Sequence, residues 1–231
     1  MKSIEQDSCP TTKVNDWEKF LGPISGADFS VFSDEFDNLT VSGYTLTKHF
    51  KIDCKKFMHD MDTELKYVNF LPIEQQGKLS FMIHLSNNKH DISSGDKLFF
   101  FKHLRGDDYE LEEETNLNIY ATKKTEYNQG LGKAIDEVTC FNHGCNTRII
   151  IHKNKSVKNF HKDLRSVLAP ENILYLDFRM IQLKDIPESD EREYFRNYER
   201  KIAFAVSLRY KNPITNMEQS TEYYDIADLH P

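Results

Sequence analysis

The sequence predicts a mainly β protein whose central part is a small barrel closed by one helix. Apolar and polar residues alternate with a period of two over Lys78–Leu85, which is typical of a strand with one buried face. Other short runs rich in Val, Ile, Thr, Phe and Tyr follow one another at hairpin-like spacing. Near residue 157 the apolar period changes to that of an amphipathic helix.

The first predicted strands precede residue 86. Leu39–Lys51 and Leu65–Leu71 are rich in β-branched and aromatic residues, and Gln75–Gly77 is a turn before the third strand. The third strand, Lys78–Leu85, presents Leu, Phe and Ile on one face. It places His84 on the other, more polar face.

The second half of the barrel is predicted with longer connections. Lys97–Leu104 is an apolar strand with three consecutive phenylalanines. The acidic run Arg105–Thr115 is expected to be an exposed loop that points away from any ligand groove. Asn116–Thr122 is predicted as a short strand, Lys123–Asn146 as a long loop, and Thr147–His152 as the last strand.

A helix is predicted to close the barrel, with Ser156 as its cap and Pro170 just beyond its end. Its apolar stripe consists of Val157, Phe160, Leu164, Val167 and Leu168. A small β unit has to protect its sheet edges, and a five-stranded barrel of this size is the OB-fold. Ile173–Leu183 and Ile202–Tyr210 add two strand-like runs in a small α/β extension.

These elements divide the chain of 231 residues into three parts. Residues 1–38 are expected to be an acidic flexible arm, and residues 39–170 the OB-fold domain. Residues 171–231 are expected to be an extension that forms a hairpin or an interaction surface. The net charge is −7, which argues against nonspecific binding to duplex DNA. Residues 41–170 contain 19 basic and 17 acidic side chains. Because this part has a net positive charge, it is the part best suited to bind a polyanion.

The cysteines and the hydropathy indicate an intracellular protein outside the membrane. No apolar run approaches the ~20 residues that span a bilayer, and the N-terminus lacks the apolar stretch of a secretory signal. Cys9 and Cys54 are expected to be reduced thiols. Cys140, His143 and Cys145 could bind zinc with Cys54 as a fourth ligand. Because their spacing is not that of a standard zinc knuckle, we expect free thiols and neither a metal nor a cofactor.

Three motifs together resemble the first OB-fold of the protection-of-telomeres family. Lys78–His84 is similar to the family's third strand, where an aromatic side chain stacks on a base. Gly95–Lys102 is similar to its fourth strand, which begins with Gly-Asp. Thr147–Ala169 is similar to the strand and helix that end the family's domain. The resemblance implies a nuclear protein of the chromosome ends that binds telomeric single-stranded DNA.

The resemblance and the loop positions of an OB-fold together give the expected DNA contacts. The imidazole of His84 is expected to stack on a base, and basic residues at the strand ends are expected to hold phosphates. The expected contacts are His84, Tyr67, Phe70, Lys48, Phe50, Lys51, Lys102, His103, Arg105, Tyr120 and Lys123.

The function that follows is binding of G-rich telomeric single-stranded DNA, which protects the chromosome end and limits telomerase access. Telomere-complex proteins are the expected partners. The sequence shows no Walker loop, G-x-S-x-G or H-E-x-x-H motif, so no enzyme is expected. Phe99 and Phe101 stand where the family has Arg and His. This difference favours the alternative of a protein-interaction subunit without its own DNA binding. Binding of RNA or of non-telomeric DNA is a third interpretation.

Overall fold

The computed structural model describes residues 26–61, 65, 67–88, 92–139, 148–152, 173–182, 202–223 and 228–230. The helices are α1 (Gly26–Asn38), α2 (Cys54–Asp60), α3 (Ile119–Gln129) and α4 (Leu131–Thr139). The strands are β1 (His49–Asp53), β2 (Tyr67–Gln75), β3 (Lys78–Ser86), β4 (Lys97–Arg105), β5 (Asp108–Glu114), β6 (Arg148–His152), β7 (Ile173–Gln182), β8 (Ile202–Lys211), β9 (Glu218–Ser220) and β10 (Asp228–His230). The predicted mainly β class is therefore confirmed.

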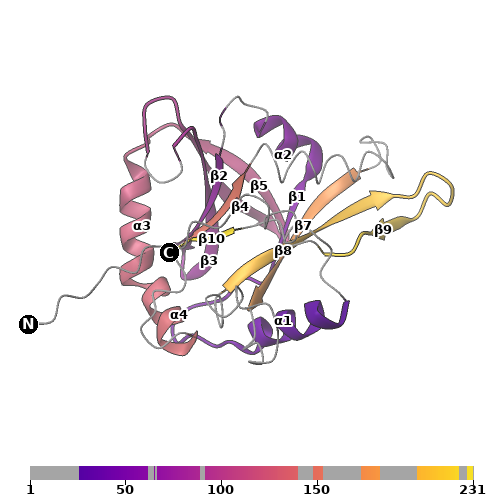
Figure 1. Cartoon of the computed structure of the whole chain (residues 1–231), viewed down its shortest axis with the longest axis horizontal. Coiled ribbons are helices and arrows are strands. Elements are labelled where there is room, and N and C mark those ends of the chain that lie inside the picture. The colour runs from indigo at the N-terminus through magenta and orange to yellow at the C-terminus, as the bar shows by residue number, and fades with distance from the viewer. Residues whose placement is uncertain are drawn as a thin grey trace, which may run out of the picture.

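The described strands form one ten-stranded sheet that curls into a half-barrel (Figure 1). Its order is β10-β6-β2-β3-β4-β5-β1-β7-β8-β9. The strands β2 to β5 form an antiparallel meander, whereas β1 lies parallel to β5 and antiparallel to β7. The closed five-stranded OB barrel stays a prediction, and its closing helix at residues 156–169 lies outside the described residues.

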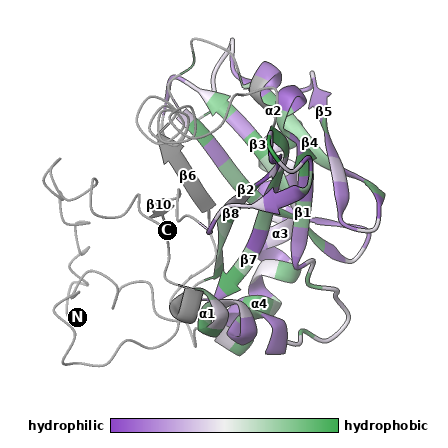
Figure 2. Cartoon of the chain, turned by 90° about the vertical axis from the view of Figure 1, so that its right-hand side faces the viewer, coloured by the Kyte–Doolittle hydropathy of each residue, from purple (hydrophilic) through white to green (hydrophobic). Residues whose placement is uncertain are grey.

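An aromatic core fills the concave face of the sheet. Alternate residues of each strand point to this face, so strands that are distant in sequence contribute side chains to one layer. Figure 2 shows hydrophobic and hydrophilic residues alternating along the strands. The rings of Phe70 and Phe204 lie 4.9 Å apart, and those of Phe50 and Phe81 lie 5.3 Å apart, in edge-to-face geometry. Helices α2 and α4 add Phe57 and Ile135, among other residues, to the same core.

Two helices cover parts of the convex face. Helix α3 packs on β2, and its Tyr120 joins Leu71, Met82 and Leu98 in a second hydrophobic cluster. Helix α1 packs on β7, where α1 and β8 contribute to a third cluster around Ile181. The convex face of β5 and β1, between these helices, carries charged residues. Among the described residues no helix combines the length and the apolar character needed to cross a membrane.

Several strand predictions are confirmed. The runs beginning at residues 65, 78, 97, 147, 173 and 202 correspond to β2, β3, β4, β6, β7 and β8. The predicted turn also forms, with positive φ at both Gln76 (53°) and Gly77 (75°). Two successive residues with positive φ match the twist of a tight two-residue hairpin, which explains why the chain reverses here. The first strand is shorter than predicted: β1 begins only at His49 of the predicted Leu39–Lys51, and it continues to Asp53.

The region between residues 105 and 139 corrects the sequence analysis. The predicted acidic loop is strand β5, in which Tyr109 and Leu111 are buried and the alternate residues carry the acidic groups. The predicted strand at 116–122 and loop from 123 are instead α3 and α4. Helix α3 buries only Tyr120 and Tyr127, and so narrow an apolar stripe is a weak helical signal.

The predicted flexible arm also needs a correction at its end. Residues 26–38 form α1, and the side chain of Phe36 is fully buried in the main core. The described part of the predicted arm is therefore an integral part of the fold. The predicted extension at residues 171–231 belongs to the same sheet as the predicted OB-fold domain, because β7 pairs with β1 along five residues.

Candidate functional site

The aromatic residues predicted to contact DNA lie mostly inside the protein. Phe50 and Phe70 are fully buried in the concave core. Tyr120 of α3 packs against the convex face of the sheet and is 6% exposed. Tyr67, at the start of β2, is half-buried. A base cannot stack on a ring that protein atoms already cover on both sides, so only Tyr67 presents surface in this set.

His84 was expected on an exposed strand face, and this expectation is wrong. Its side chain is fully buried, and Nε2 lies 2.7 Å from Oδ2 of Asp96. The ring also contacts Tyr120 edge-on, with centroids 5.0 Å apart. The reason is that α3 covers the convex face of β3, so that both faces of this strand are buried.

The Asp96 carboxylate is a fixed partner for this histidine. It also accepts hydrogen bonds from the backbone N–H of Ser93 (2.8 Å) and from the Ser93 hydroxyl (3.0 Å). Burial raises the pKa of Asp96, but the hydrogen bonds from His84 and Ser93 outweigh burial and lower it below the ordinary value. His84 and Asp96 therefore form a structural pair that joins β3 to the loop before β4.

The lysines and the arginine predicted to contact phosphate all have a carboxylate partner. Each Lys or Arg of the set forms an ion pair within 4 Å with an acidic residue of this chain. The pairs are Lys48–Asp37 (3.4 Å), Lys51–Asp107 (3.9 Å), Lys102–Glu110 (3.4 Å), Lys102–Glu112 (2.9 Å), Arg105–Asp108 (3.6 Å) and Lys123–Glu126 (2.6 Å). His103 instead shares a hydrogen bond with the carbonyl of Gly106 (3.0 Å). Nucleic-acid phosphates would have to displace these carboxylates.

The described residues do contain a groove, and it lies where β3 and β4 separate. Their pairing runs from Leu85 opposite Lys97 only as far as Met82 opposite Phe100. Both strands continue past this point, β3 back to Lys78 and β4 on to Arg105. We call the gap between residues 78–81 and 101–105 the β3–β4 fork.

The fork groove has a volume of about 960 Å³ and is roofed by α3. Ser80, Lys102 and Glu112 come from the convex side of the sheet. Leu79 and Tyr109 come from the concave side, and they line the same groove. The groove therefore lies at the end of the sheet where β3 and β4 are no longer paired. Its volume is in the range of sites that bind small molecules or peptide side chains.

Carboxylates outnumber amines around this groove. The basic residues that line it are Lys78, Lys102 and Lys123, and the acidic ones are Glu74, Glu112, Glu114 and Glu126. The acidic run was expected to point away from any groove. That expectation is wrong for Glu112 and Glu114, because strand alternation turns both to the convex side.

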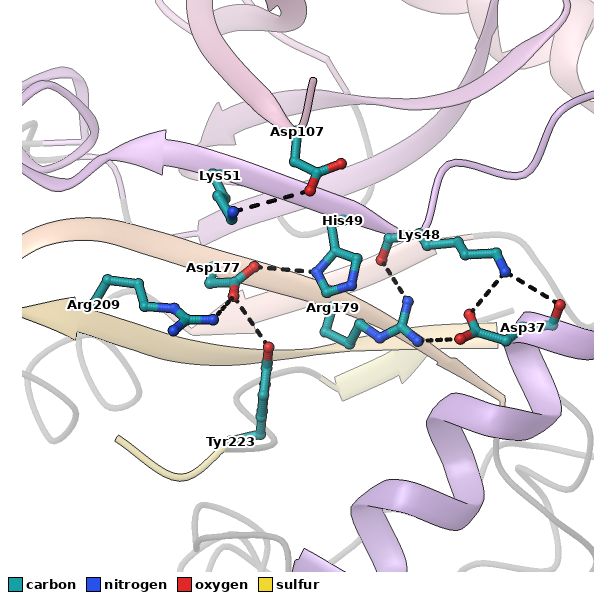
Figure 3. A network of polar contacts seen from close by, with 9 residues as sticks. All are labelled: Asp37, Lys48, His49, Lys51, Asp107, Asp177, Arg179, Arg209 and Tyr223. Carbon is teal, nitrogen blue, oxygen red and sulfur yellow. Dashed lines mark hydrogen bonds and ion pairs between the residues drawn. The ribbon is translucent and has the colours of Figure 1, made fainter. Parts of the chain in front are cut away.

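A second polar cluster lies on the convex face of β1, β7 and β8 (Figure 3). The fully buried carboxylate of Asp177 is at its centre. Its Oδ1 lies 3.4 Å from Nδ1 of His49, while its Oδ2 accepts hydrogen bonds from the Tyr223 hydroxyl (3.1 Å) and from Arg209 (3.3 Å). Tyr223 stacks on Phe29 of α1, with centroids 4.0 Å apart.

Asp37 of α1 anchors the other end of this cluster. Its carboxylate pairs with the guanidinium of Arg179 and with Lys48, and Arg179 also donates to the Lys48 carbonyl (3.4 Å). We call Lys48, His49, Lys51, Arg179 and Arg209 the convex basic cluster. The sequence analysis named Lys48 and Lys51 but missed the other three. The only local signal was the basic stretch Lys48–Lys51, because the arginines come from strands more than 120 residues further on.

The predicted thiols can be placed only in part. Cys54 is a buried free thiol at the start of α2, and burial, with a smaller effect of Asp53, raises its pKa to about 11. Cys9, Cys140, His143 and Cys145 lie outside the described residues. Within the described ranges, no three His, Cys, Asp or Glu side chains are grouped as a metal site would need.

Comparison with protein-family models, with curated proteins and with solved structures found no match for this chain. The resemblance to the protection-of-telomeres family therefore stays a prediction, and the function has to be argued from the geometry above.

Proposed function

We propose that this protein is a non-catalytic protein-interaction module that holds a segment of a partner protein in the fork groove. The open fork carries this proposal. A strand inside a sheet normally has neighbours on both sides, yet Lys102–Arg105 of β4 are exposed and pair with β5 alone among the described strands. Such an edge is a site where another chain can add.

The charges favour protein over nucleic acid as the ligand. Binding a polyanion gains free energy from releasing counterions when free Lys and Arg meet phosphates. The lysines and the arginine predicted for this role already neutralise carboxylates, and the groove carries more Glu than Lys. A protein segment does not suffer this repulsion.

The proposal is tested by crosslinking from the groove. A photoreactive residue at Leu104, which is 53% exposed at the fork, is compared with one at Ile214, which is 92% exposed on the β8–β9 hairpin. The expected result is a partner crosslinked from position 104 and not from 214, in an extract of the cells that make the protein. The same partner, purified, is expected to bind the chain with defined stoichiometry in calorimetry. Equal labelling from both positions would contradict the proposal.

The second candidate is the predicted OB-fold protein that binds telomeric single-stranded DNA in the nucleus. The convex basic cluster favours it, because five basic residues from β1, β7, β8 and the residue before β1 meet on one face. Fluorescence anisotropy with a G-rich oligonucleotide, its complement, the duplex and the RNA equivalent at 150 mM salt separates the two candidates. Our proposal expects no selective binding. Tight binding to the G-rich strand that Arg209→Glu abolishes, while Lys211→Glu does not, would establish the second candidate instead.

A further inference from the structure

The sheet ends at β9, and this strand leaves one side open. Among the described strands it pairs with β8 alone, and all three of its residues are exposed. Figure 1 shows the β8–β9 hairpin projecting from the rest of the molecule, so a second strand could approach the outer side of β9. Unpaired N–H and carbonyl groups along such an edge are a template for another strand.

The hydrogen bonds of the hairpin show which backbone groups face outward. The Thr221 N–H donates to the Leu208 carbonyl (3.0 Å), and the Met217 carbonyl accepts from the residue after β8 (2.9 Å). Thr221 and Met217 therefore direct backbone groups toward β8. Because alternate residues of a strand direct these groups to the same side, the N–H and the carbonyl of Glu218 and of Ser220 face the open edge.

The hairpin is held in this conformation by its own side chains. The Oε1 atom of Gln219 accepts hydrogen bonds from the Tyr210 hydroxyl (3.1 Å) and from the Asn212 amide (3.0 Å). In the turn, Oδ1 of Asn212 accepts from the backbone N–H groups of Ile214 (2.9 Å) and Thr215 (3.1 Å). An edge that is already ordered loses little conformational freedom when a second strand joins it.

The charges along the edge are complementary to those of a second copy of this chain. Within the hairpin, Ser220 lies opposite Arg209, and Glu218 lies opposite Lys211. In an antiparallel pair of two β9 strands with Gln219 on the two-fold axis, Ser220 of one copy lies opposite Glu218 of the second copy. Each carboxylate then lies between a hydroxyl donor of the other copy and a lysine of its own. Such cross-strand pairs stabilise a sheet.

The other symmetric registers lack this complementarity. With Glu218 on the axis, two glutamates lie directly opposite each other. With Ser220 on the axis, Glu218 lies opposite Glu222 of the second copy. Like charges in these positions are destabilising. A shift by one residue instead sets outward-facing backbone groups against groups that already bond to β8, so the new hydrogen bonds are lost.

From this arrangement we infer that two copies of this chain join through β9, in antiparallel pairing about a two-fold axis at Gln219. The N–H and carbonyl groups of Glu218 and Ser220 bond to those of the second copy, and the two sheets become one. The same surface serves both copies, so the assembly closes as a dimer. One short strand is a small contact beside the ~1,200–2,000 Å² of a stable interface, so the dimer is weak and reversible.

Sedimentation equilibrium of the full chain tests the dimer. At 150 mM salt, with a reducing agent present, the average mass is expected to rise from that of one chain toward twice this value as the concentration increases from about 5 to about 300 µM. A mass of one chain throughout this range would overturn the inference. That result would leave the proposed interaction module standing, because the fork groove does not include β9.

Matched variants locate the contact. Ser220→Glu sets a carboxylate opposite Glu218 of the second copy and is expected to weaken the dimer at least tenfold. Thr215→Glu adds the same charge at an exposed position of the same hairpin, outside the pairing, and is expected to weaken it less than twofold. Equal losses would show a general charge effect and contradict the site. Thermal unfolding checks that both variants fold.

A charge swap and a disulfide test the register. Adding Glu218→Lys to Ser220→Glu sets a lysine opposite each new glutamate and is expected to restore the dimer to within threefold of the parent chain. Gln219→Cys places two thiols at the axis, and oxidised glutathione is expected to join the copies, whereas Thr215→Cys should give no more dimer than the parent chain. Failure of the swap to restore the dimer, or equal crosslinking from positions 215 and 219, would overturn the register.

Discussion

The carboxylate of Asp177 lies fully buried on the convex face, at the point where β1, β7 and β8 meet α1 and the chain after β9. Burial raises the pKa of Asp177. The hydrogen bond with His49, then the hydrogen bond from Tyr223 and the positive charge of Arg209, outweigh burial and lower this pKa below the ordinary value of 3.8. The ionised form is thus the one that the fold stabilises. Charged groups this deeply buried need such partners, since unpaired burial is costly.

Asp177→Asn tests this stabilisation by its pH dependence. Because the pKa is lower in the folded state, the carboxylate adds stability that is fully present above its ordinary pKa and is lost as the pH falls through the folded pKa. We expect the variant to lose about 3 kcal/mol at pH 7, with the difference from the parent chain shrinking below pH ~4. Urea unfolding from pH 7 to pH 3 measures it. Asp107→Asn, at a half-exposed pair with Lys51, is the control and should lose less than about 1 kcal/mol.

His84 offers a second prediction, because its imidazole is a core group rather than an exposed ring. His84→Ala leaves the buried carboxylate of Asp96 without its nearest side-chain partner. We expect the free energy of unfolding to fall by about 2–3 kcal/mol, measured by urea denaturation. His59→Ala, at an exposed position of α2, should change it by less than about 0.5 kcal/mol. Equal small effects in the two variants would mean that the pair does not form.

Among the elements, the junction of α3 and α4 shows how closely the helices pack. Tyr127, the last buried residue of α3, lies against Gly132 in the first turn of α4. A Cβ atom at position 132 would come within 2.7 Å of the Tyr127 ring and 2.8 Å of its carbonyl oxygen. The glycine therefore allows the chain to turn from α3 into α4 without separating the two helices.

Gly132→Ala consequently should destabilise the protein, although alanine is ordinarily the better residue within a helix by about 1 kcal/mol. We expect a loss of about 1–3 kcal/mol from the contact with Tyr127, observed as a lower Tm in thermal unfolding. Lys133→Ala, exposed on the next position of α4, is the matched control and should leave the Tm nearly unchanged. An increase of the Tm in Gly132→Ala would show that the helices have room to move apart.

At the scale of the whole molecule, the sheet joins parts of the chain that the sequence analysis treated as separate. Strand β7 pairs with β1, and Phe178 of β7 and Phe204 of β8 pack against Phe70 in the concave core. A chain that ends at Pro170 would lose these rings and expose their apolar partners to water. The core is therefore a shared property of the middle and the last part of the chain.

We expect a chain that ends at Pro170 not to fold cooperatively. Circular dichroism should show no sharp thermal transition, and amide resonances should be poorly dispersed, in contrast to the full chain. The control is the full chain with Ile214→Ala, which truncates an exposed residue of the β8–β9 hairpin and should unfold normally. A sharp transition in the shortened chain would instead support the predicted independent domain at residues 39–170.

The sequence by itself determined where most strands lie, because the alternation of Lys78–Leu85 and the apolar run Lys97–Leu104 are local patterns. It misassigned β5 and α3, since a row of acidic residues and a narrow apolar stripe are weak local signals. It also indicated an overall acidic chain, and the groove at the fork has an excess of carboxylates.

Only the tertiary structure decided which of the predicted contact residues are exposed and unpaired, and so able to bind a ligand. His84 is buried because α3, more than 30 residues further on, covers the convex face of β3. The charge of Lys102 is balanced because β5 returns beside β4. His49 and Asp177 meet across 128 positions of sequence because β1 and β7 are neighbours in the sheet. The period of a strand depends on neighbouring residues, whereas burial and ion pairing depend on which distant element lies next to it.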